Sequence, residues 1–279
     1  MRRLGFATLA LLALSRPAVG QQRPLVTEDS EPIGAGRVLI EGGIDYGHDQ
    51  TYPVSGLTGN LWRIPSIGVS VGISSIAEFQ IDSGIDHLGI TKRQAAPLSS
   101  LVTATGTTTT DVDDVVIGTK IKLVSEAESH PAFTFRFATR LPNASNESGL
   151  GLDTFDFYPS LLVGKTVQSI RVVGNVGLGI LADPTNGNRQ NDVLTYGFSV
   201  ARAVTTAAEL VGEVNGRAST RSGGPFPGTE SRAILKLGGR YTHGPGRFDA
   251  AIFFGLTGVD PTIGFTAGYT YVFNAFTLP

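Results

Sequence analysis

The sequence predicts an all-β protein, a transmembrane antiparallel up-and-down β-barrel of about 12 strands. The first observation is a period of two: along most of the chain, apolar side chains alternate with small or polar ones, which places the two sets on opposite faces of a strand. The second is the length of these runs, which is close to the ~9–11 residues that cross a bilayer as a tilted strand. The third is that long and short connections alternate, as when long outer loops oppose short periplasmic turns.

The last run shows this pattern most clearly. In Ile263–Phe273 the odd positions are apolar or aromatic, and the even positions up to Thr270 are glycine or threonine. An open strand edge in hydrocarbon would leave backbone N–H and C=O groups unpaired, at a high free-energy cost. We therefore expect this strand to pair with the first one, Arg37–Tyr46, and to close the barrel.

Composition excludes several other classes of protein. Charged residues are 16% and hydrophobic residues 41% of the 279 residues, which excludes a disordered chain. No apolar run of eighteen residues follows the N-terminus, which excludes a helical membrane protein. The chain has no cysteine, and no phosphate loop, zinc-ligand spacing or calcium loop is present, so we expect no disulfide, metal or cofactor.

Residues 1–20 are typical of a secretory signal peptide. Two arginines precede the apolar run Leu4–Leu14, and Ala18-Val19-Gly20 is a small-x-small cleavage site. Cleavage there removes three of the 22 basic residues and leaves 19 against 24 acidic ones, which gives no reason to expect nucleic-acid binding. The predicted location is the bacterial outer membrane, where the expected partners are lipids, the barrel-assembly machinery and a small-molecule solute.

The mature chain is expected to have three parts: a polar periplasmic segment at 21–36, the barrel at 37–276 and a tail at 277–279. After the first strand, the predicted strands cover roughly 61–71, 77–85, 115–124, 133–141, 155–163, 170–180, 194–200, 208–215, 233–241, 248–256 and 263–273. In the second strand Arg63 falls on the apolar parity, so Pro65 is expected to mark a bulge or an entry from the rim. The longest predicted loop, 87–112, is of a length that is usually functional or mobile.

The polar faces of the strands carry the charges that we expect to line the lumen. The predicted pore-lining residues are Glu41, Asp45, Glu78, Asp82, Lys120, Lys122, Arg136, Arg140, Glu209, Glu213, Arg232, Lys236 and Arg240. Opposed rows of acids and bases would orient a polar or zwitterionic solute and set ion selectivity. Alternatively, neighbouring strands pair these charges across the ladder and fill the interior. The sequence leaves both interpretations open.

Aromatic residues fall mainly on the other face, where we expect contact with lipid or membership of the interface girdles. This set includes Tyr46, Phe155, Phe157, Tyr241, Phe248, Tyr269 and Phe273. Tyr158 has the inward parity that stacking on an aromatic solute would require, but one such residue is weak support for a binding platform.

An enzyme is the second class of function to weigh. The chain has four histidines, of which His130 and His243 fall in predicted short turns. His48 and His87 fall at the predicted outer rim, where Asp45 and Ser83 could approach them. No serine lies in a recognisable nucleophile motif, and a nucleophile needs a base within hydrogen-bond reach. Surface histidines are therefore the preferred interpretation, and no enzyme is predicted.

Several short stretches resemble the outer-membrane barrels grouped as the putative MetA-pathway of phenol degradation family. These are Arg23–Asp29, Gly34–Glu41, Asp114–Lys120, Leu141-Pro142 and Gly174–Gly177. The resemblance covers most of the mature chain and implies a barrel that moves small, hydrophobic or aromatic compounds. One departure is the end of the chain, where Thr277-Leu278-Pro279 follow Phe276, whereas outer-membrane proteins commonly finish on an aromatic residue.

Together these patterns predict a porin-like outer-membrane channel or transporter for the passive passage of small solutes. The alternative is a closed structural or surface-interaction barrel that acts through its extracellular loops.

Overall fold

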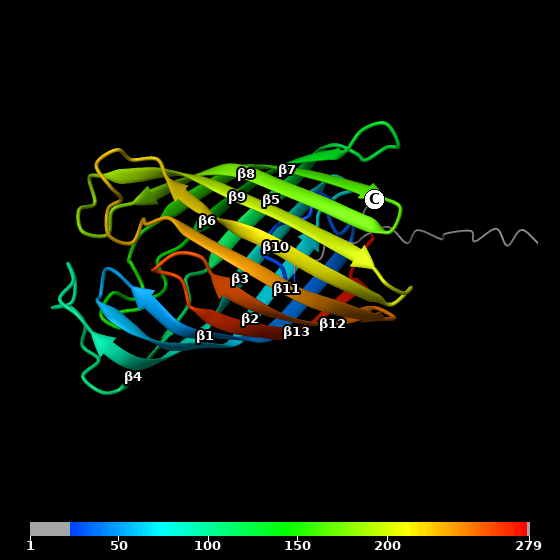
Figure 1. The fold of residues 1–279 in the computed structure, drawn as a ribbon. Helices are drawn as coiled ribbons and strands as arrows, with labels where there is room; N and C mark the ends of the chain where they lie inside the picture. Colours follow the sequence, from blue (N-terminus) through cyan, green and yellow to red (C-terminus); the bar gives the residue numbers. More distant parts are fainter. Residues whose placement is uncertain (1–22, 278–279) are drawn as a thin grey trace, which may run out of the picture.

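The barrel wall is built from long antiparallel strands, and a computed structural model describes it over residues 23–277 (Figure 1). The predicted signal peptide, 1–20, lies outside the described residues. The strands are β1 (Arg37–Tyr52), β2 (Leu57–Gly72), β3 (Ala77–Arg93), β4 (Thr108–Val112), β5 (Val116–Val124), β6 (Ala132–Arg140), β7 (Asp156–Val167), β8 (Ile170–Ala182), β9 (Gln190–Ala203), β10 (Ala208–Ser219), β11 (Arg232–His243), β12 (Gly246–Gly255) and β13 (Ile263–Asn274). Among the described residues, no helix is long and apolar enough to cross a membrane.

Twelve of these strands form a closed ring, which confirms the predicted fold class. Each pairs antiparallel with its neighbours along the chain, and β1 pairs with β13 from Arg37 opposite Asn274 to His48 opposite Ile263. The last strand therefore meets the first, as its alternation predicts. Closure removes both edges of the ring, so each of these twelve strands has a partner on each side, while β4 pairs with β3 alone.

The predicted loop at 87–112 is shorter than expected because both of its ends are strand. β3 continues to Arg93, and β4 pairs with the far half of β3, with Ile85 opposite Val112 and Gly89 opposite Thr108. Only 94–107 and 113–115 are left outside the strands on this connection. Likewise β1 and β2 run on as a hairpin, so the first long loop of the prediction is the short connection 53–56.

The two ends of the barrel differ, as Figure 1 shows. At one end, here called the turn end, the connections are short, and Ala275 N–H donates to the carbonyl of Gly36, so both ends of the barrel chain meet there. At the other end, the loop end, lie 94–107, 141–155, 183–189, 220–231 and 256–262. This arrangement is that of outer-membrane barrels, in which the turns face the periplasm.

The predicted bulge in the second strand is confirmed. On β2, Arg63 and Ser66 are three residues apart, but their partners on β3, Asp86 and Gly84, are two apart, and the register with β1 shifts at the same place. β2 thus carries one extra residue beside Pro65, which has no N–H to give to the ladder. The extra residue turns Arg63 inward, where it forms an ion pair with Asp86 at 2.8 Å.

Burial in this molecule is reversed relative to a soluble protein. Leu210 and Phe248 on the outer face are 62% and 60% exposed, whereas Lys120 and Glu78 inside are 0% exposed. Lipid is the natural partner of such an apolar outer surface. The interior is therefore polar and charged, and its groups must be satisfied by one another.

Candidate functional site

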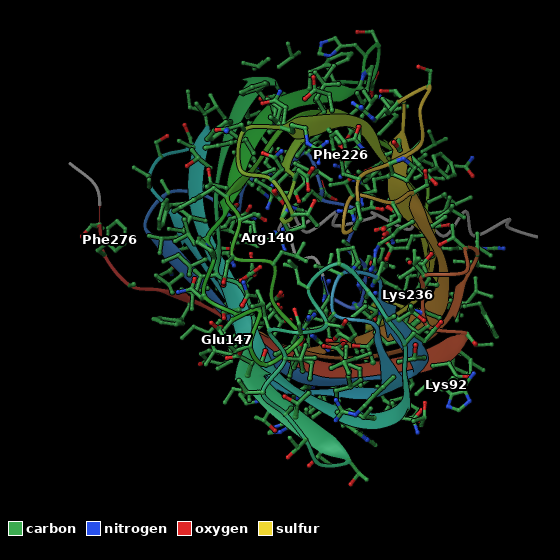
Figure 2. The ribbon with its side chains drawn as sticks, turned by 90° about the vertical axis from the view of Figure 1, so that its left-hand side faces the viewer. Lys92, Arg140, Glu147, Phe226, Lys236 and Phe276 are labelled. Atoms are coloured by element: carbon green, nitrogen blue, oxygen red, sulfur yellow. The ribbon has the colours of Figure 1, made fainter. Side chains whose placement is uncertain are left out.

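Predicted inward charges do meet across neighbouring strands. Figure 2, a view along the barrel from the loop end, shows Arg140 and Lys236 within the ring of strands and Lys92 and Phe276 outside it. In three ion pairs both residues belong to the predicted set and are direct partners in the ladder: Glu78–Lys120 at 3.3 Å, Glu213–Lys236 at 3.5 Å and Glu209–Arg240 at 3.8 Å. The interpretation as cross-strand pairs is thus realised for these residues.

The N-terminal segment, residues 23–36, lies inside the barrel. The sequence predicts a periplasmic segment at 21–36 and leaves open whether it plugs the lumen. Its three acids contact bases of the wall. Glu28 pairs with Arg136 at 3.0 Å and Lys120 at 3.5 Å. Asp29 pairs with Arg171 on β8 at 2.6 Å, and Glu31 pairs with Lys122 at 3.1 Å. The bases on β5 and β6 therefore form ion pairs with the acids of this segment.

The backbone of the segment is also held by the wall. Glu213 accepts hydrogen bonds from the N–H groups of Val26 and Thr27 at 2.8–3.0 Å, and Glu78 accepts one from Ile33 at 2.7 Å. Lys236 donates to the carbonyl of Pro24 at 2.7 Å. Because these contacts come from β3, β10 and β11, the segment crosses the lumen from one wall to another.

Two apolar side chains anchor the segment further. Ile33 packs with Leu39 and Val272 near the turn end, and Leu25 packs with Ala201 and Val211 on β9 and β10. Burying a side chain of this size contributes about 1.5–3 kcal/mol each. The segment is thus a packed part of the interior.

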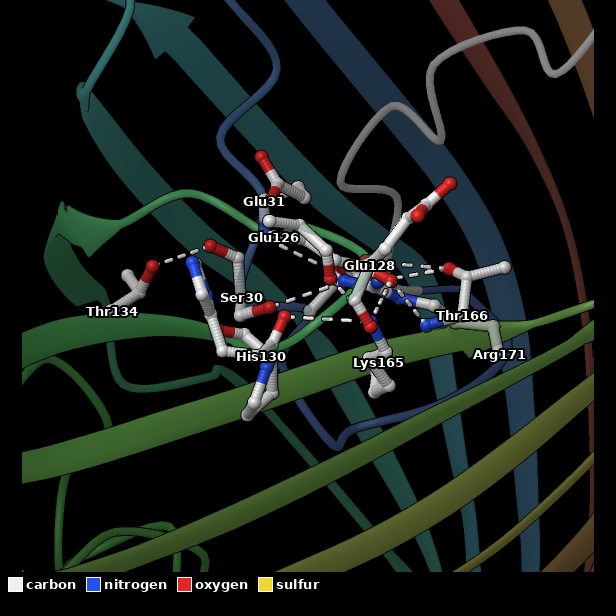
Figure 3. A network of polar contacts seen from close by, with 12 residues as sticks. Ser30, Glu31, Glu126, Glu128, His130, Thr134, Lys165, Thr166 and Arg171 are labelled. Carbon is white, nitrogen blue, oxygen red and sulfur yellow. Dashed lines mark hydrogen bonds and ion pairs between the residues drawn. The ribbon is translucent and has the colours of Figure 1, made fainter.

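Figure 3 shows how this segment is tied to the turn end. Arg171 donates to Ser30 Oγ at 3.1 Å and to Glu126 at 2.6 Å, and Glu126 belongs to the turn between β5 and β6. Lys165 on β7 donates to backbone carbonyls of the same turn. Thr134 on β6 donates to the carbonyl of Ser30. One network therefore joins the segment, a turn and the strands β6, β7 and β8.

Arg23 is the far end of the described segment and lies in a groove made by two glycines. It donates to Ser66 Oγ at 2.9 Å and Thr266 Oγ1 at 2.7 Å. A Cβ on Gly43 or Gly268, which face each other in the β1–β13 ladder, would lie 2.3 Å from the Arg23 guanidinium group. The absence of side chains at these two positions makes room for Arg23 against the wall.

Two adjoining cavities remain in the lumen beside the segment. They have volumes of about 470 and 480 Å³ and share lining residues, among them Val26, Asn215, Ile234 and Phe253. A third cavity of about 230 Å³, lined by Tyr52, lies between the loops at the loop end. Pockets of a few hundred Å³ suit small organic molecules.

The predicted site residues divide between these cavities and the contacts of the segment. Glu41, Asp45, Asp82, Arg136 and Lys236 line the second cavity, Arg232 lines the first and third, and Arg140 lines the third. The remaining six lie among the ladder pairs and segment contacts: Glu78, Lys120, Lys122, Glu209, Glu213 and Arg240. Whether any of them lines a conducting path stays a prediction.

Three lining residues were missed from the sequence. Arg63 has the wrong parity until the bulge is counted, and Arg217 lies beyond the predicted end of its strand. Phe253 has the inward parity of β12, where it pairs with Lys236 on β11. Extending the alternation of inward and outward residues from Asn215 to Arg217 would have identified Arg217.

The histidines at the predicted rim take other partners than the enzyme interpretation requires. His48 Nδ1 lies 2.8 Å from Asn60 Oδ1, and His87 Nδ1 lies 2.9 Å from Thr110 Oγ1. Among the described residues, no group of three His, Cys, Asp or Glu side chains is placed to hold a metal ion.

Comparison with solved structures supports the fold. The "COG4313 outer membrane channel from Pseudomonas putida F1" matches with a TM-score of 0.59 and 11% identity, over 88% of this chain and 98% of that one. The "NanC porin" matches with a TM-score of 0.53 and 8% identity, over 84% and 98% of the two chains. At these identities the likeness establishes an outer-membrane barrel fold. No curated protein sequence matches the chain.

The family is established by the sequence itself. A family model matches residues 25–273, which span the segment inside the lumen from Leu25 and the strands up to Phe273. The match covers well over half of the chain and agrees with the closed barrel. The chain belongs to the family described as "Putative MetA-pathway of phenol degradation".

Proposed function

We propose that this protein is an outer-membrane channel for the passive passage of small solutes, including hydrophobic or aromatic compounds. The observation that carries the proposal is a closed barrel whose interior holds cavities of about 470 and 480 Å³ lined by both charged and apolar side chains. A barrel with a purely structural role could fill this space with side chains. The family membership and the channel-type relatives support the same function.

In this proposal the predicted signal peptide sends the chain across the inner membrane, and the barrel-assembly machinery inserts it. The turn end faces the periplasm and the loop end faces outward. The N-terminal segment narrows the lumen, so solutes pass beside it through the space that Arg136 and Lys236 line.

The second candidate is a closed barrel that acts through its outer loops. It is favoured by one observation, the continuous contacts that hold residues 23–36 across the lumen. The two functions differ in what a loop deletion does. Shortening 94–107 should alter the conductance of a channel, whereas it should abolish partner binding by a surface-interaction barrel and leave conductance at zero.

The test is single-channel recording of the folded barrel in a planar bilayer. We expect discrete current steps, and we expect Arg136→Glu or Lys236→Glu to shift selectivity toward cations because each change places a negative charge on the wall of the cavity. A folded barrel that carries no current and takes up no small sugar or aromatic solute in vesicles would overturn the channel.

A further inference from the structure

The lining of the first lumen cavity is mixed. It includes the apolar side chains of Leu61 on β2, Ile234 on β11 and Phe253 on β12, with Val26 of the segment. It also includes polar and charged side chains, among them Arg217 on β10 and Tyr158 on β7. A volume of about 470 Å³ holds a single aromatic ring with a substituent. Such a site would accept a molecule that is apolar at one end and polar at the other.

The arginines that line this cavity differ in how well they are neutralised. Arg63 has Asp86 and Asp113, each at 2.8 Å, and Arg136 has Glu28 at 3.0 Å. These guanidinium groups have their counter-charges within the protein and are not available to a ligand without a loss of stability.

Arg217 is different. Within the described part of the chain, no carboxylate lies within ion-pair distance of it, and its hydrogen bonds go to the backbone carbonyls of Gly228 and Glu230, each at 2.8 Å. Its direct partner in the β10–β11 ladder is another cation, Arg232, whose own carboxylate, Asp260, is 3.8 Å away. Like charges opposite each other in a ladder destabilise it. This position therefore has an excess of positive charge.

A second donor faces the same space. Asn215 precedes Arg217 by two residues on the inward face of β10, and it lines both lumen cavities. Its Nδ2 is buried and has no hydrogen-bond partner. A buried donor without an acceptor costs free energy unless a ligand or water satisfies it.

We propose that this cavity is a binding site for a small aromatic carboxylate. The carboxylate accepts hydrogen bonds from Arg217 and Asn215, and the ring packs against Ile234, Phe253 and Val26. A guanidinium group matches a carboxylate in geometry and charge better than any neutral group does. The inference rests on the proposed channel function and names the solute class that the lumen selects.

Binding of benzoate and of its neutral analogue benzamide to the full-length mature barrel in detergent tests this site. Calorimetry at fixed ionic strength should give a dissociation constant at least about ten-fold lower for benzoate, since a hydrogen bond to a charged group contributes that much or more. Arg217→Gln should weaken benzoate binding by about the same factor and leave benzamide unchanged, and Arg217→Lys should restore part of the affinity.

Two further variants serve as controls. Arg202→Gln removes the same charge from an exposed position at the end of β9 and should leave both affinities unchanged. Asn215→Leu, of similar branched shape, should weaken benzoate binding without removing a charge, and it provides a test if the Arg217 variants do not fold.

The outcomes separate this inference from the channel function. The carboxylate site is wrong if benzamide and benzoate bind equally, or if neither Arg217→Gln nor Asn215→Leu weakens benzoate binding. The proposed channel function would still stand in that case if the barrel conducts. If the barrel neither conducts nor binds any of these solutes, both proposals fall. Benzoate binding that is lost only in the Arg217 and Asn215 variants establishes the site.

Discussion

Two walls of the lumen hold the N-terminal segment in different ways. On β5, β6 and β8 each of its acids reaches a base, at distances from 2.6 to 3.5 Å. On β1, β12 and β13 the only charged side chain that the segment contributes is Arg23, with Asp249 at 3.5 Å and Asp45 at 3.8 Å. Polar atoms on this second wall are buried without hydrogen-bond partners: Glu41 Oε2, both carboxylate oxygens of Asp249, Nε and Nη1 of Arg247, and Thr270 Oγ1.

The two walls therefore differ in how firmly they hold the segment. Residues 28–36 are held by ion pairs, backbone hydrogen bonds and the packing of Ile33, whereas Arg23 has hydrogen bonds to Ser66 and Thr266 but only long ion pairs. An unsatisfied buried polar group costs about 1–3 kcal/mol, so the second wall favours contact with water or a solute. The side formed by β5, β6 and β8 is here called the matched wall, and the side formed by β1, β12 and β13 the unmatched wall.

The largest effect is expected on the matched wall from Lys120→Met. Lys120 and Glu78 have no exposed side-chain surface, so the change leaves Glu78 buried without its cation. Removing one partner of a buried pair costs about 3–5 kcal/mol. Urea unfolding of the barrel in lipid should show a loss of this size.

The control for this prediction is Lys122→Met on the same strand. Its pair with Glu31 is partly exposed, at 16% and 21% for the two side chains, so a loss of about 1 kcal/mol or less is expected. Equal losses for the two variants would contradict the view that burial of the Lys120 pair fixes the segment.

On the unmatched wall, Arg23→Gln should change conductance more than stability. The ion pairs lost are long, and the Gln amide keeps an N–H donor, so the free energy of unfolding should fall by less than in Lys120→Met. The shorter, neutral side chain should leave the groove at Gly43 and Gly268 more open, and single-channel conductance should rise. Lys92→Gln, an exposed charge outside the ring of strands, is the control and should not change it.

Gly268→Ala sharpens the same comparison without touching Arg23. The three atoms nearest to the added Cβ all belong to the Arg23 side chain, the closest at 2.3 Å, so the flexible guanidinium group must move. Conductance should change in the same direction as in Arg23→Gln, and the double variant should add nothing. Gly174→Ala, where the added Cβ meets nothing within 4 Å, should behave as the wild type.

These walls also show which part of the site could be predicted from sequence. The period of two placed Glu78, Lys120 and Glu213 on the inward face, and the ladder then determines their partners. The ends of β1–β3 could not be predicted, because His48, Asp49 and Gln50 continue the strand beyond the lipid band, where alternation is no longer required.

The position of the segment could not be predicted because much of its hold comes from backbone groups, which leave no periodic pattern. Glu213 and Lys236 bind the N–H and C=O groups of residues 24–27, whatever their side chains are. One signal was available in the sequence. The positive charges of Lys120, Lys122 and Arg136 outnumber the acids on neighbouring strands, and the acids that neutralise them lie in residues 28–31. An unbalanced inward face thus indicates a partner from outside the strands.

The smallest expected effect is a change in the local stability of a loop at the loop end, away from both walls. Burial raises the pKa of Asp183, but hydrogen bonds from the hydroxyl and N–H of Thr185 and the charge of Arg189 outweigh it, so the pKa is lowered overall. A carboxyl with a depressed folded pKa stabilises the fold above its unfolded pKa of about 3.9, and this stabilisation is lost as the pH falls through the folded value.

The protection factors of the amides in 183–189, which compare the measured exchange rates with the intrinsic rates at the same pH, should therefore fall below about pH 4. In Asp183→Asn the protection of this loop should be low at every pH, because the charge that holds Arg189 is gone. Exchange of Val26 and Thr27, whose N–H groups are held within the lumen, serves as the reference. If the amides of the wild-type loop kept the same protection factors at pH 3 as at pH 7, the carboxylate would not be what orders the loop.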